Sequence, residues 1–185
     1  MNINVNNVLL KAADILNITT VIDLENITPS DVFSSELTLL LRCFNMTLEE
    51  VSRDYFPLLF KQTLTPVNGV IANTAFTKTP VEIFSVKKGG EAVEYSLYPD
   101  GMHLSANTEH EIIYGYLSGD KTIEEIVEVH PKVTEGLLVL GTLMNYCVAS
   151  SKYEDSLIYE RRFKETVQEK LKKAGELKLP ERRWI

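Results

Sequence analysis

The spacing of apolar residues at the start of the chain predicts a helix. Val5, Val8, Leu9, Ala12 and Leu16 recur every three or four positions, which is the period of one helix face. Asn4 stands just ahead of them, and its side chain can accept a hydrogen bond from a free first-turn amide. We therefore expect an amphipathic helix over residues about 4–16.

A second apolar series follows a connector through Thr28-Pro29-Ser30. Its members lie alternately four and three positions apart: Leu37, Leu41, Phe44, Leu48, Val51 and Tyr55. This spacing predicts one long helix over residues 31–55. Pro57 ends it, because proline lacks the amide hydrogen that helix continuation needs.

The middle of the chain changes to short runs of β-branched and aromatic residues separated by glycine and proline. We expect strands near residues 58–65, 69–76, 81–87, 92–98, 102–105 and 110–117. Two tight hairpins are expected, at residues 87–91, which include Gly89-Gly90, and at Pro99-Asp100-Gly101.

Two of these strands have a distinctive pattern. Val93, Tyr95 and Leu97 alternate with polar residues, so we expect them to share the buried face of a half-buried strand. Residues 112–117 are apolar on both faces, which is typical of a central strand.

The final third is predicted to be helical again. Thr122 and Glu125 form a capping-box pattern, which predicts a short helix that ends before Pro131. A broadly apolar stretch predicts a buried helix over residues 132–150. A last helix is expected to begin at a second capping-box pattern, residues 151–154, and to end at Gly175. Its apolar stripe consists of Tyr159, Phe163, Val167, Leu171 and Ala174.

This order of elements predicts an α+β fold. N-terminal helices and two long C-terminal helices form a helical bundle, and an antiparallel β module of hairpins is inserted at about residues 58–117. We expect a single domain over residues 1–175, helical at 1–56 and 120–175, with the β module at 57–119. Residues 176–185 are expected to form an extended C-terminal tail.

The charge distribution argues against general nucleic-acid binding as the main activity. The 185 residues carry a net charge of −7, whereas such binders need positive charge to displace counterions from phosphates. Residues 152–185 carry ten basic and seven acidic side chains, so they are net positive at +3, and residues 1–151 carry a net charge of −10. The body is acidic and the C-terminal part is basic.

Cys43 and Cys147 lie in apolar helical patterns, and we expect them to be buried free thiols. The first residues lack a basic segment followed by an apolar one, so we expect no secretory signal. The most apolar stretch, residues 136–149, is shorter than the roughly 20 residues of a membrane-spanning helix.

No catalytic, cofactor-binding or metal-binding motif is found in the sequence. His103, His110 and His130 have no partner at metal-ligand spacing, and we expect His103 and His110 to face solvent. The carboxylate pairs Glu49-Glu50 and Glu124-Glu125 are expected on helices, where neighbouring side chains point apart. The expectation is a protein that is not an enzyme and binds no cofactor.

The extreme C-terminus is the strongest candidate binding segment. Tryptophan and arginine are enriched at interface hot spots, and this segment is too short to form a core of its own. The expected partner-binding residues are Leu179, Pro180, Arg182, Arg183, Trp184 and Ile185. Either Trp184 folds back on its own helices, or, as we prefer, it docks on another chain.

Several segments, taken in order, resemble the head-to-tail adaptors of tailed bacteriophages, the tail tubular protein A-like connectors. Two of them frame the last strands: Tyr98-Pro-Asp-Gly-Met-His-Leu104 and Glu111-Ile-Ile-Tyr-Gly-Tyr-Leu117. The others are the helix end Tyr146-Cys-Val-Ala-Ser-Ser-Lys-Tyr153 and the exit Leu179-Pro-Glu-Arg-Arg-Trp184. The similarity covers most of the chain as an order of elements. The β module here has few glycines and tryptophans and the tail is short, which departs from the family's pattern.

The resemblance implies a structural virion protein without catalytic residues. Such a protein forms a homo-oligomeric ring, twelve-fold in many members, beneath the portal protein. It contacts further tail or neck proteins, lets DNA pass through its lumen without specific binding, and uses its C-terminal segment to dock on the portal or a neighbouring subunit. Its location is the neck of the virion, after assembly in the host cytoplasm, with no membrane contact. The acidic body is compatible with a lumen that does not grip DNA, if acidic faces point inward.

Two other readings remain open from sequence. One is a cytosolic protein-binding or regulatory module without catalytic activity. The other is a small hydrolase with an unfamiliar site, in which His103, His110 and carboxylates would gather in one pocket.

Overall fold

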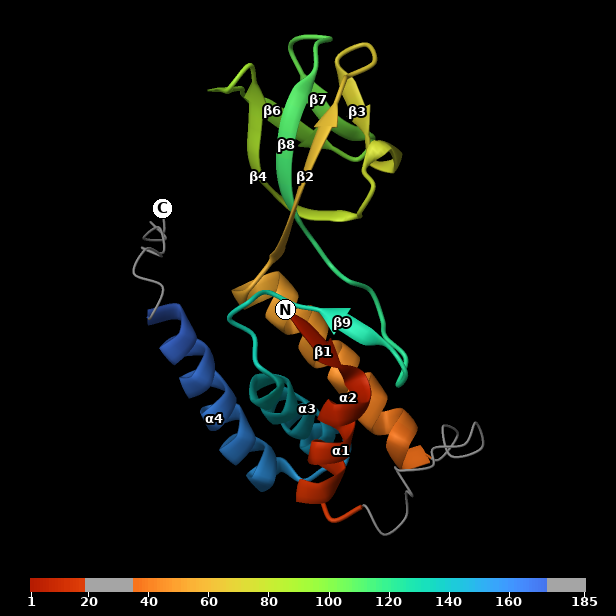
Figure 1. Ribbon diagram of the computed structural model, residues 1–185, viewed down its shortest axis with the longest axis vertical. Coiled ribbons are helices and arrows are strands. Elements are labelled where there is room, and N and C mark those ends of the chain that lie inside the picture. The colour runs from red at the N-terminus through yellow and green to blue at the C-terminus, as the bar shows by residue number, and fades with distance from the viewer. Residues whose placement is uncertain (19–34, 173–185) are drawn as a thin grey trace. The chain divides into compact units, whose positions relative to one another are not determined.

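The computed structural model describes residues 1–18 and 35–172, which have an α+β fold (Figure 1). It has N-terminal helices, two packed C-terminal helices and central antiparallel sheets of hairpins, as the sequence predicts. The chain divides into two compact units. The helical unit comprises residues 1–48, 121–127 and 131 onward, and the β unit comprises residues 49–120 and 128–130. The single domain expected over residues 1–175, with a separate tail, stays a prediction.

The first predicted helix is confirmed. Strand β1 (Asn2–Asn4) leads into α1 (Val5–Ile15), and the Asn4 side chain accepts a hydrogen bond from the Asn6 amide at 2.9 Å. The residues at helical spacing on α1 are buried, including Val8 and Leu9, which are fully inaccessible to solvent.

The second predicted helix is confirmed over its described part, since residues 31–34 lie outside the described residues. It is α2 (Ser35–Glu50), followed by the π-helical turn η3 (Val51–Tyr55), which belongs to the β unit. The helical run ends at Phe56, because the following proline disfavours helical geometry at the residue before it.

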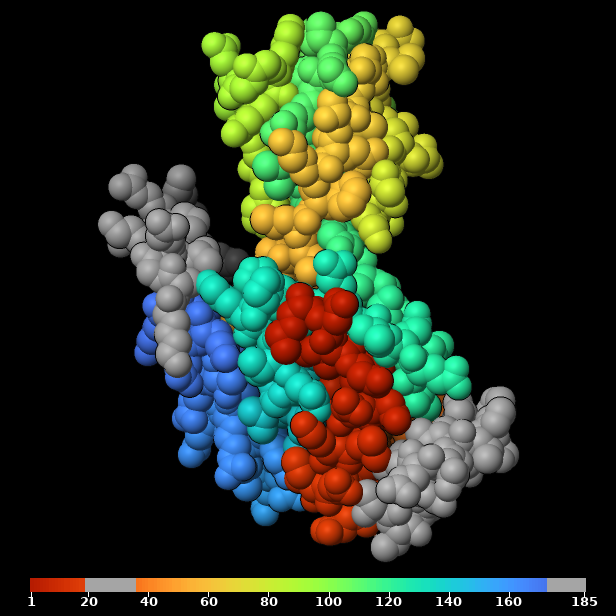
Figure 2. All heavy atoms as spheres, viewed as in Figure 1, coloured from red at the N-terminus to blue at the C-terminus, as the bar shows by residue number. Residues whose placement is uncertain are grey.

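Two C-terminal helices complete the helical unit. They are α3 (Glu135–Ala149) and α4 (Tyr153–Lys172), and α3 packs against both α1 and α4 (Figures 1 and 2). Helix α3 begins three residues later than expected. The Thr134 hydroxyl accepts a hydrogen bond from the Leu137 amide and caps the helix there. Most side chains of α3 are buried, as its broad apolar pattern predicts.

The three longest helices meet closely at Gly141 in the middle of α3. A Cβ atom at this position would lie 2.3 Å from Thr47 Cγ2 on α2 and 3.1 Å from the Phe163 ring on α4. Thr47 is itself fully buried. Its hydroxyl donates a hydrogen bond to the Cys43 carbonyl at 2.9 Å and accepts one from Asn145 Nδ2 at 3.0 Å. The missing side chain of glycine therefore permits the close approach.

The β unit consists of two antiparallel sheets that share one core. One sheet has the strand order β2-β8-β4-β5, and the other has the order β3-β7-β6. The strands are β2 (Leu58–Leu64), β3 (Val70–Ala72), β4 (Pro80–Lys88), β5 (Glu91–Ala92), β6 (Tyr95–Tyr98), β7 (Gly101–Leu104) and β8 (His110–Tyr116), with a 3-10 turn, η4 (Asn73–Ala75), after β3. The shared core consists of Leu58, Ile71, Val86, Met102, Leu104, Ile112, Tyr114 and Tyr116. Strand β8 is central, as its two apolar faces predict.

Both predicted hairpins are confirmed. Gly89 and Gly90 have φ of 57° and 92°, the left-handed geometry that lets β4 turn directly into β5. Pro99 and Asp100 form the two-residue loop between β6 and β7, with Tyr98 paired to Gly101.

The prediction of a helix that begins at Thr122 is wrong. The Thr122 amide and hydroxyl both donate to the Glu125 carboxylate, at 2.6 and 3.1 Å, and the Glu125 amide donates to the Thr122 carbonyl at 3.3 Å. These bonds close a turn, after which β9 (Ile126–Glu128) pairs with β1. Pairing with the distant N-terminal strand buries Val127 completely, and this outweighs the local preference for a helix. The pair Glu124-Glu125 is therefore not helical.

The expected burial along β6 is wrong at Leu97. Val93 and Tyr95 are partly buried, but Leu97 is 61% exposed. Strand β6 is an edge strand, so its outer part has no neighbouring strand on one side to cover it.

Candidate interaction surfaces

The two cysteines are the first candidates for reactive side chains. Cys43 and Cys147 are free and buried, which confirms the sequence expectation. Burial, with a smaller contribution from Cys147, raises the pKa of the Cys43 thiol from 9.0 to about 11. Burial also raises the pKa of Cys147. Both thiols are thus held in the protonated form, which is a poor nucleophile.

The three histidines have separate surroundings. His103 Nε2 lies 3.0 Å from both carboxylate oxygens of Asp100, and its ring packs on Tyr98 with centroids 4.6 Å apart. His110 is fully buried and its Nδ1 lies 2.6 Å from the Thr108 carbonyl, so the expectation that it faces solvent is wrong. His130 stacks on Phe56 with centroids 5.7 Å apart. Within residues 1–18 and 35–172, no cluster of three or more potential ligands could hold a metal ion.

His110 is buried because it shares the inward face of β8. It is two and four positions before Ile112 and Tyr114, and successive residues of a strand alternate between faces. This alternation was already visible in the sequence and could have predicted its burial.

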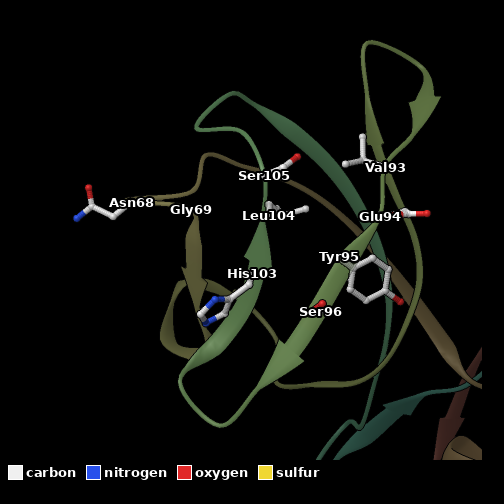
Figure 3. Close-up of a pocket in the computed structure, with 9 residues that line it drawn as sticks. All are labelled: Asn68, Gly69, Val93, Glu94, Tyr95, Ser96, His103, Leu104 and Ser105. Carbon is white, nitrogen blue, oxygen red and sulfur yellow. The ribbon is translucent and has the colours of Figure 1, made fainter.

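A wide polar concavity of about 680 Å³ lies over β6 and β7 (Figure 3). Its lining residues are Asn68, Gly69, Val93, Glu94, Tyr95, Ser96, His103, Leu104 and Ser105. Ser96 and His103 are directly opposite each other in the strand register. His103 Nε2 is oriented toward the Asp100 carboxylate, 3.0 Å from each of its oxygens.

Four exposed apolar side chains lie near the end of α3 and the start of α4. We call this set the α4 patch, and its members are Val148 (49% exposed), Tyr153 (63%), Leu157 (64%) and Ile158 (52%). Tyr153 and Leu157 are one turn apart on α4 and are therefore neighbours on its surface. All four side chains are about half exposed or more, so this end of α4 offers apolar surface that a partner could cover.

The β unit has a second apolar surface feature, which we call the β4–β6 groove. It is a depression of about 200 Å³ lined by Asn73, Phe76, Pro80, Val81, Glu82, Ile83, Leu97, Tyr98 and Met102. Met102 is buried, whereas Val81, Leu97 and Tyr98 are 43%, 61% and 57% exposed. Apart from Asn73 and Glu82, its lining is apolar or aromatic.

The expected partner-binding residues of the C-terminus lie outside the described residues. These are Leu179, Pro180, Arg182, Arg183, Trp184 and Ile185. The two apolar surfaces were not expected from the sequence.

No helix of the described chain has both the length and the apolar character needed to cross a bilayer. Comparison with protein-family models and with curated proteins finds no match for this chain. Evidence on function therefore comes from its own surfaces, of which the α4 patch and the β4–β6 groove are the best candidates for contact with another protein.

Proposed function

We propose that this chain is a structural virion protein, a head-to-tail adaptor that forms a ring beneath the portal protein. The ring, twelve-fold in its proposed form, joins the capsid to the tail at the virion neck and lets DNA pass through its lumen. The observation that carries the proposal is the α4 patch, because it gives the helical unit a surface suited to a neighbouring subunit.

The burial pattern of α4 supports such a contact. Only Ser156, Phe163 and Val167 of its twenty residues are buried, so the helix packs on α3 along one narrow face. The exposed apolar side chains lie outside that face, at the N-terminal end of the helix. A helix of an isolated globular domain normally presents polar residues there. An adjacent copy in a ring would remove this apolar surface from water.

The charge of the chain is compatible with a DNA-conducting ring. Residues 1–151 carry a net charge of −10, and like charge keeps DNA from adhering to a wall that it must slide past.

The test is whether the α4 patch is needed for assembly with the portal. The full-length protein is mixed with the portal, and ring formation is measured by native mass spectrometry and negative-stain imaging. Leu157→Lys places a charge in the patch and should abolish or severely weaken the ring. Met46→Lys is the matched control, because Met46 is 58% exposed on α2 and lies outside the patch. A wild-type chain that stays monomeric with the portal would contradict the proposal.

A cytosolic protein-binding module is the second candidate, and the β4–β6 groove is the observation that favours it. An apolar groove between strand edges is a common site for an extended peptide. In that case the wild-type protein would remain monomeric and would not bind the portal, and Leu157→Lys would have no effect on partner binding.

A further inference from the structure

The β4–β6 groove lies where two neighbouring strands separate. The Val93 amide donates to the Val86 carbonyl at 3.0 Å, and β5 pairs with β4 only at Lys87 and Lys88. Beyond this point the chain leaves β4, and β6 pairs with β7 instead. The Tyr95 hydroxyl still reaches the Ile83 carbonyl at 3.3 Å. Past it, residues 80–82 of β4 and residues 97–98 of β6 line the two sides of the groove.

Each of these strands is open along the groove. On its other side, β4 pairs with β8 from Pro80 to Lys87, and among the strands that the structure describes β6 pairs only with β7. Open strand edges have free backbone donors and acceptors and readily accept another strand. Here the open edges coincide with the exposed apolar side chains of Val81, Leu97 and Tyr98, so an added segment would gain both backbone and side-chain contacts.

The chain itself contains a segment with matching chemistry. Thirteen residues follow α4, and fully extended they reach about 45 Å. Leu177 and Leu179 flank Lys178, an alternation that suits an added strand with one apolar face. Arg182, Arg183 and Trp184 come last, and Trp184 is the only tryptophan of the protein.

The lining of the groove complements the end of this segment. Phe76, Ile83 and Met102 provide an apolar site for an indole ring. Glu82 lies in the lining and is exposed, and it forms no ion pair within the described residues. A carboxylate beside an apolar pocket fits a segment in which guanidinium groups precede a tryptophan.

We propose that the C-terminal segment of a second copy of this chain docks in the β4–β6 groove. It adds a strand at the open edges, places Trp184 over Phe76, Ile83 and Met102, and sets Arg182 or Arg183 against Glu82. This inference rests on the proposed ring, because one groove and one tail per copy make a head-to-tail contact that can close into a ring.

The single tryptophan gives a direct readout of docking. In the full-length protein, indole burial in the groove should shift the fluorescence emission to shorter wavelength. Leu97→Lys places a cation at the rim and should return the emission to that of an exposed indole. Leu59→Lys is the matched control, since Leu59 is also exposed, at 57%, on β2 and outside the groove.

Mixing two variants tests whether the tail comes from another copy. A Trp184→Ala copy has an intact groove and no tryptophan, whereas a Leu97→Lys copy has an intact tail and a blocked groove. Adding the Trp184→Ala copy to the Leu97→Lys copy should restore the short-wavelength emission. As a control, a Trp184→Ala copy that also carries Leu97→Lys should associate with it at least about tenfold more weakly. Absence of this transfer would overturn the inference. A short-wavelength emission of Leu97→Lys alone would overturn it too, because the indole would then be buried elsewhere.

Failure of the inference is distinguishable from failure of the proposed function. If the wild-type and Trp184→Ala chains form the same rings with the portal, docking in the groove is refuted and the adaptor ring stands. If fluorescence transfer occurs but no ring forms with the portal, the tail contact stands and the adaptor ring is refuted.

Discussion

Replacing Gly141 by alanine should destabilise the helical unit, although alanine is the better helix former. The new methyl group would lie 2.3 Å from Thr47 Cγ2, more than 1 Å closer than an ordinary carbon–carbon contact of about 3.5–4.0 Å. Thr47 cannot turn away at low cost, because its hydroxyl is held by hydrogen bonds to Cys43 and Asn145. Phe163 restricts movement on the other side, at 3.1 Å.

The expected size of the effect follows from two opposing contributions. Overpacking of this kind costs about 1–3 kcal/mol. The change from glycine to alanine inside a helix returns about 1 kcal/mol. The net loss of unfolding free energy is then about 0–2 kcal/mol, and because the clash is with a buried and hydrogen-bonded side chain we expect the upper half of this range for Gly141→Ala, about 1–2 kcal/mol.

Gly136→Ala is the matched control on the same helix. A Cβ atom at Gly136 would meet nothing within 4 Å, so only the helix-forming preference remains, and stability should rise by up to about 1 kcal/mol. Urea denaturation followed by far-ultraviolet circular dichroism measures both variants, because the helices dominate that signal. Equal or greater stability of Gly141→Ala would refute the close packing of α2, α3 and α4 at this point.

Further predictions concern the same buried region. Thr47→Val removes the hydroxyl between the Cys43 carbonyl and the Asn145 amide, and should cost about 1–3 kcal/mol of unfolding free energy, although valine has nearly the same shape. Wild-type stability of this variant by urea denaturation would show that the hydrogen bonds contribute little. The Cys43 pKa of about 11 in the fold, against 9.0 when exposed, means that the unfolded chain loses this proton first. Stability should therefore be intact below pH 9 and fall as the pH rises toward 11, with a shallower fall for Cys43→Ala. The melting temperature of both proteins is measured as a function of pH, and an equal decrease in the wild type and in Cys43→Ala would contradict the role given to Cys43.

Most helices and strands could be predicted because one buried face determines their spacing. The apolar positions of α1 and the alternation of β8 are examples, since each element places the same residues toward a core. A local capping residue also predicted the start of α1 correctly: the Asn4 side chain accepts a hydrogen bond from the Asn6 amide. Both kinds of signal depend only on residues that are close together in the sequence.

The segment that begins at Thr122 shows where such reasoning fails. The Thr122–Glu125 hydrogen bonds form as the capping pattern predicts, but they close a turn instead of opening a helix. The outcome depends on β1, more than 100 residues earlier in the chain. A local pattern contains no information about such a distant partner.

The candidate surfaces were only partly accessible from the sequence. The stripe through Phe163 and Val167 correctly identified the buried face of α4. Leu157 lies off that stripe, and its exposure could have been inferred from the helix period. The β4–β6 groove could not be inferred, because it depends on where the chain leaves β4 after β5 and joins the other sheet as β6.

The division of the chain has a consequence for the order of folding during synthesis. The helical unit is discontinuous, because α1 and α2 precede the β unit and α3 and α4 follow it. Helices α1 and α2 therefore leave the ribosome long before α3, the helix against which α1 packs. The seven strands β2 to β8 are contiguous in sequence and can pair first, with residues 128–130 added soon after. The earliest helices are left with an exposed apolar face until the last third of the chain is made, the interval in which a nascent chain is most prone to aggregation.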